Sequence, residues 1–64
     1  MNVITLNPTV WQHALQVFGG EEKAARWMAT RLAELQERTP EDVVGADPDA
    51  VEAILDRIEY GVFS

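Results

Sequence analysis

Residues 7–22, which read NPTVWQHALQVFGGEE, decide the fold of this chain. The opening Asn-Pro pair marks a helix start, because an Asn side chain caps free backbone N–H groups and proline suits the first helical position. The apolar residues that follow recur at helical spacing, and Gly19 ends the pattern. Two glutamates then suit the positive end of a second helix. We therefore expect a helix over residues 8–18, followed at once by another.

The same punctuation recurs farther along the chain, as Thr39-Pro40 and Asp47-Pro48. Between these marks, apolar residues stand at steps of three and four, as they do on one face of a helix. Acid-before-base pairs four residues apart, Glu22 with Arg26 and Glu34 with Arg38, favour helix over the second segment. The sequence thus predicts three further helices, over residues 21–37, 40–44 and 48–60.

The expected fold class is all-α, a compact bundle of about four short helices in a single domain of residues 1–64. Residues 1–6 are expected to be extended, and residues 61–64 to form a short tail after the stop at Gly61. No internal repeat divides the chain. A domain this small has little core, so association with itself or with another protein is expected.

Composition excludes several classes of function. The chain has no cysteine, so it has neither a disulfide framework nor a thiolate zinc site. Five Lys and Arg against eleven Asp and Glu give a net charge of −6, which argues against direct nucleic-acid binding. Residues 1–20 hold none of these charged residues. However, polar side chains interrupt the apolar residues of this segment, and it does not begin with the basic residues of a signal peptide. We expect neither a signal peptide nor a membrane span, and hence a cytoplasmic protein.

Catalytic chemistry finds no support in the residue types present. His13 is the only histidine, and we expect an ordinary surface or core histidine; a metal site there would need carboxylates from residues 21–37 or 48–60. Ser64 is the only serine, so no nucleophile and base are evident. Asp47, Asp49 and Glu52 hint at calcium, but Pro48 and the missing loop glycine break the spacing of an EF-hand loop. We expect no enzyme activity, no metal and no cofactor.

The C-terminal end is unusual in two respects. Tyr60, Val62 and Phe63 are apolar residues at or beyond the expected helix stop, so they either fold back on the core or enter a partner. Arg57 has no acidic residue three or four positions away, and it forms either an ion pair with another helix or an intermolecular contact.

Four stretches resemble one family in their order and spacing: VFGGEEKA at 17–24, ARWM at 25–28, LQERTPEDV at 35–43 and LDRIEYGV at 55–62. The family is the toxin-binding domain of the Xre/MbcA/ParS-like antitoxins. The chain departs from it in three places. Thr30-Arg31 stands where the family often has Pro-Asn, and Gln36-Glu37 replaces a glycine-bearing turn. The usual N-terminal helix-turn-helix region is absent, so the chain is either a minimal antitoxin or an excised domain.

The resemblance implies a protein inhibitor of a type II toxin–antitoxin system. In similar systems the partner is a RES-domain toxin that consumes NAD or transfers ADP-ribose, and the antitoxin's C-terminal segment blocks the toxin's active site. The positions carried over as toxin-binding are Arg57, Glu59, Tyr60, Gly61, Val62 and Phe63, with the terminal carboxylate of Ser64. The resemblance also suggests a homodimer, for which the uncharged first helix offers Val10, Trp11, Leu15 and Phe18.

Two other functions remain open. The chain could be a small helical dimerisation or adaptor module that recruits a transcriptional regulator. An acidic DNA mimic ranks lower, because the acids are scattered over residues 21–59 and interrupted by five bases.

Overall fold

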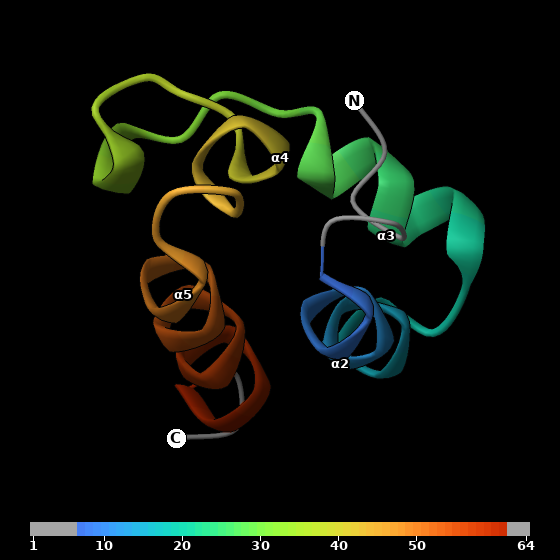
Figure 1. Cartoon of the computed structure of the whole chain (residues 1–64). Coiled ribbons are helices and arrows are strands. Elements are labelled where there is room, and N and C mark those ends of the chain that lie inside the picture. Colours follow the sequence, from blue (N-terminus) through green and yellow to red (C-terminus); the bar gives the residue numbers. More distant parts are fainter. Residues whose placement is uncertain (1–6, 62–64) are drawn as a thin grey trace.

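The computed structural model describes residues 7–61, and within them the fold is all-α, as predicted. The helices pack around one core of buried apolar side chains, and Figure 1 shows how they are arranged. The expected extended segment 1–6 and the tail residues 62–64 lie outside the described part. None of the helices in the described part has both the length and the apolarity that crossing a membrane requires. The elements are α2 (Pro8–Phe18), α3 (Glu21–Met28), the 3₁₀ turn η1 (Ala33–Leu35), α4 (Pro40–Val43) and α5 (Pro48–Gly61).

The three predicted capping pairs each start a helix. Asn7 accepts a hydrogen bond from the backbone N–H of Val10 at 3.1 Å, at the start of α2. Thr39 does the same for α4 and Asp47 for α5, each at 3.2 Å. These bonds satisfy backbone donors that a helix start leaves free, which is why the sequence predicts these starts correctly.

Gly19 turns the chain from α2 into α3. Its φ of 79° lies in the left-handed region, and its N–H donates to the carbonyl of Leu15 at 2.8 Å. This geometry ends a helix and is easiest for glycine. Across the turn, the rings of Phe18 and Trp27 lie 5.4 Å apart between centroids, and they join α2 to α3.

The helix predicted over residues 21–37 is wrong beyond Met28. There the chain turns, Leu32 forms an isolated bridge with Arg38, and η1 lies between them. This loop brings Leu35 into the core, where it is 6% exposed. Packing of that side chain outweighs the helix propensity of its neighbours, a common outcome when tertiary contacts compete with local preference.

The loop also changes the predicted ion pairs. Glu22 and Arg26 form theirs on α3, at 3.6 Å. Glu34 does not share a helix with Arg38, and it instead contacts Arg57 of α5 at 3.3 Å.

α2 spans residues 8–18 as predicted, whereas the ends of α4 and α5 each differ from the prediction by one residue. α4 ends at Val43 rather than at residue 44, and α5 continues through Gly61, where a stop was expected.

The core lies where α2, α3, α4 and α5 meet. α2 packs against both α3 and α5, and α4 packs against α3 and α5. The apolar residues buried there are Val10, Trp11, Ala14, Ala24, Met28, Leu35, Val43, Val44, Val51, Ile54 and Leu55.

Candidate functional site

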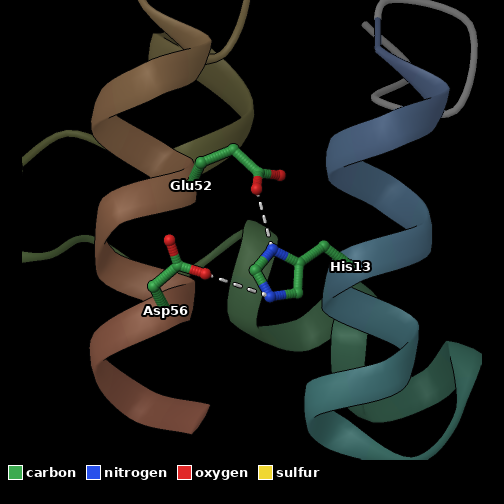
Figure 2. Close-up of side chains that lie close together, drawn as sticks. All are labelled: His13, Glu52 and Asp56. Carbon is green, nitrogen blue, oxygen red and sulfur yellow. Dashed lines mark hydrogen bonds and ion pairs between the residues drawn. The ribbon is translucent and has the colours of Figure 1, made fainter. Parts of the chain in front are cut away.

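Helix α5 presents three sides to its surroundings. Val51, Ile54 and Leu55 face the core and are buried. Glu52, Asp56 and Glu59 stand four and then three residues apart, so they lie along a second side. This acidic side faces α2 and meets His13 (Figure 2). The third side is open to solvent.

His13 contacts all three carboxylates of the acidic side. Its Nδ1 lies 2.8 Å from Oε2 of Glu52, and its Nε2 lies 3.2 Å from Oε1 of Glu59. Oδ1 of Asp56 is 3.6 Å from Nε2, an ion-pair distance rather than a hydrogen bond. The His13 side chain is only 14% exposed. A single ring therefore joins α2 to α5 at a largely buried position.

The geometry favours the imidazolium form of His13. A carboxylate only accepts hydrogen bonds, so each of the two short contacts needs a proton on the ring nitrogen. Burial alone would lower the pKa of His13. The hydrogen bonds to Glu52 and Glu59, with the negative charges of Glu52 and Asp56, together outweigh burial and raise its pKa above the ordinary value.

Glu52 depends on His13 for its hydrogen bonding. Its Oε2 accepts from the ring, while its Oε1 is buried and has no hydrogen-bond partner among the described residues. An unsatisfied buried oxygen is costly, and more so on a charged group. The Glu52 carboxylate thus relies on the charge of His13.

Ligand atoms of His13, Glu52 and Asp56 lie within 4.8 Å of one another, close enough to share a cation. However, both ring nitrogens already contact carboxylates, so the arrangement suits an imidazolium among three acids. An open hollow on α2 adjoins the ring and is lined by Thr9, Gln12, His13, Leu15, Gln16 and Glu52.

The predicted toxin-binding residues fall into separate groups. Arg57 and Tyr60 lie three residues apart on the open side of α5, and Gly61 ends the helix beside them. Tyr60 is 72% exposed, whereas Glu59 is turned toward His13. Val62, Phe63 and Ser64 lie outside the described residues.

The predicted self-association residues also separate. Val10 and Trp11 are buried in the core of the single chain. Leu15 and Phe18 are half-buried and pack against the edge of that core. Of the four, only the latter two have surface left to offer a second copy.

Sequence reasoning did not identify the acidic side of α5 as the partner of His13. The signal was present, as three acids at helical spacing and a single histidine. The missing information was the packing of α2 on α5, which brings together residues 39 positions apart in the chain.

Comparison with known proteins identifies a family and a curated relative. The family described as the antitoxin Xre/MbcA/ParS C-terminal toxin-binding domain matches residues 13–61. A curated relative, "Antitoxin Xre" of Yersinia enterocolitica serotype O:8 / biotype 1B (strain NCTC 13174 / 8081), is 36% identical over 58 residues. That match covers 86% of this chain and 39% of the relative, so the chain spans about two fifths of the relative's length. No solved structure matches the chain.

Proposed function

Because the chain belongs to the Xre/MbcA/ParS antitoxin C-terminal toxin-binding domain family, we propose that it is the toxin-binding part of an antitoxin. Its partner is a RES-type toxin that consumes NAD or transfers ADP-ribose in the cytoplasm. The end of α5, with the residues after it, binds at the mouth of the toxin's active site and keeps the substrate out.

The observation that carries this proposal is the exposure of Tyr60. Among the described residues, Tyr60 is the large hydrophobic residue that is exposed, with 72% of its surface accessible. It lies on the last turn of α5. Burial of a solvent-exposed tyrosine ring by a partner favours binding. Tyrosines are also frequent among the residues that dominate binding interfaces. The family match also ends at this turn, at residue 61.

Arg57 is available to the same partner. Its ion pair with Glu34 joins two exposed side chains, 64% and 50% accessible. Such surface pairs contribute little to stability, so exchanging Glu34 for a carboxylate or phosphate on a partner costs little. Arg57 and Tyr60 together offer a charge and a ring on one side of a helix.

Charge supports association with a basic partner. An enzyme that binds NAD must hold two phosphates, and we expect basic residues around them. The net charge of −6 on this chain, all of it in residues 21–64, attracts such a surface from a distance.

Self-association through the first helix is part of the proposal. Leu15 and Phe18 are its contact residues, and Val10 and Trp11 support the helix from the core side.

Co-expression with a cognate RES-type toxin tests the proposal. We expect growth rescue by the wild type, and partial loss of rescue for Arg57→Ala and for Tyr60→Ala. Arg31→Ala is the matched control, because Arg31 is also exposed and carries the same charge but lies in the loop before η1 rather than on α5.

Full rescue by both variants would contradict binding through α5. A chain that ends at Tyr60 tests the contribution of the residues after it, and we expect weaker rescue than by the full chain. If the wild type instead binds a transcriptional regulator and never relieves toxicity, the adaptor function is correct.

A further inference from the structure

We propose that His13 is a positioning residue for the toxin-binding end of α5: its imidazolium joins Glu52 and Glu59 and holds the last turns of α5 against α2. The consequence for toxin binding rests on the proposed function. The contact between the two helices is a property of this chain alone.

The spacing of the two glutamates makes the contact effective. Glu52 and Glu59 are seven residues apart, which corresponds to about two turns or ~10 Å along a helix axis. One ring bonded to both carboxylates restrains α5 at two points rather than one. It therefore opposes a tilt of the last turns, which carry Arg57 and Tyr60, away from α2.

Among the described residues, no cation other than His13 lies within ion-pair distance of Glu52, Asp56 or Glu59. The charged groups within ion-pair distance of His13 are Glu52, Asp56 and Glu59, and all belong to α5. Apart from His13 itself, α2 carries no charged residue, and α3, its other neighbour, brings none within that distance.

Loss of one ring proton therefore weakens the contact. A neutral imidazole keeps a single N–H and can donate to only one of the two carboxylates. Three negative charges then face each other without a cation between them. We expect the end of α5 to loosen as the solution becomes more basic.

Proton NMR tests this contact directly, because His13 is the only histidine and its ring signals need no assignment. We expect a midpoint above about pH 6.5 in the wild-type chain. Glu52→Gln and Glu59→Gln each remove one charge from the acidic side and should lower that midpoint. Asp49→Asn is the matched control, because it removes an exposed charge from the first turn of the same helix.

Thermal unfolding provides a second measurement. The raised pKa means that the stabilisation is complete below about pH 6.5 and is lost as the pH rises through the folded-state pKa. We expect the Tm of the wild type to fall between pH 6.5 and pH 8.5. His13→Gln should show a smaller fall, and Glu59→Gln gives the same comparison if His13→Gln does not fold.

Toxin binding is measured at the same two pH values. We expect the wild type to bind its cognate RES-type toxin several-fold more weakly at pH 8.5, and His13→Gln to show a smaller change. If the wild type binds that toxin at neither pH, the proposed function fails, while the NMR titration still decides the role of His13.

Three results would overturn the inference. One is a wild-type midpoint at or below about pH 6.5. Another is an equal midpoint in Glu52→Gln, Glu59→Gln and Asp49→Asn. The third is a Tm that falls when EDTA is added, because a bound metal ion would then join these side chains in place of the proton.

Discussion

At the scale of single residues, the turn after η1 is the least favourable backbone of the described chain. Gln36 and Glu37 have φ of 59° and 65°, in the left-handed region that glycine adopts most easily. The turn lets Leu32 pair with Arg38 and keeps Leu35 in the core. The chain therefore tolerates two strained residues for the sake of one buried side chain.

Gln36→Gly should stabilise the fold. Glycine relieves the steric cost of the left-handed conformation, about 1 kcal/mol, against a smaller loss from the greater freedom of the unfolded chain. We expect a net gain of about 0.5 kcal/mol, which denaturant unfolding measures.

Gln16→Gly is the matched control for this change. Gln16 is equally exposed but lies within α2, where glycine should cost about 1 kcal/mol. Equal effects of the two substitutions would show that the turn is not strained.

At the scale of elements, α5 combines functions that the other helices do not. One side supplies core residues, one side holds the carboxylates that face His13, and the open side offers Arg57 and Tyr60. The end of the helix is thus held from two directions while its outer side stays accessible. Substitutions on the three sides should therefore separately affect core stability, the contact with His13 and toxin binding.

Leu55→Ala tests the core side. The residue is fully buried, so the substitution leaves a cavity and should cost about 3 kcal/mol. For a chain this small, that is a large part of a total stability of about 5 kcal/mol. Chemical denaturation should show the midpoint falling sharply.

Arg57→Ala on the open side of α5 provides the comparison. We expect it to change the free energy of unfolding by no more than about 0.5 kcal/mol. A similar small loss for Leu55→Ala would mean that α5 does not pack as described.

The capping pairs show which elements a sequence can predict. Asn7, Thr39 and Asp47 act on backbone groups three residues away, so their effect is local and readable. The end of α3 is different, because nothing near Met28 resembles a stop, and the turn depends on Leu35 reaching a distant core.

The candidate site shows the same limit. The sequence alone marks Tyr60 and Arg57 as unusual, and both lie on the open side of α5. The link between His13 and Glu59 spans 46 positions and follows only from the packing of α2 on α5. Local patterns cannot predict such a pair.

At the scale of the whole molecule, charge is distributed unevenly. The first twenty residues contain no Lys, Arg, Asp or Glu, and the net charge of −6 that these residue types give lies in the rest. The acidic part includes the end of α5, where we propose that the toxin binds. Long-range attraction should therefore speed the encounter more than it tightens the final complex.

Salt dependence tests this expectation. Raising the ionic strength from 0.05 M to 0.5 M should lower the association rate by about tenfold, because exposed charges are then screened. The dissociation rate should change much less. Surface plasmon resonance measures both rates, and an association rate that is independent of salt would contradict electrostatic attraction.

The central claim is that the end of α5 binds the toxin, and calorimetric titration of the toxin with wild type and Tyr60→Ala tests it most directly. Tyr60 is 72% exposed, so the substitution should leave the fold intact, as circular dichroism can verify. We predict that Tyr60→Ala binds about 30-fold more weakly, the effect of losing one dominant interface residue. Equal affinity of Tyr60→Ala and the wild type would contradict the account.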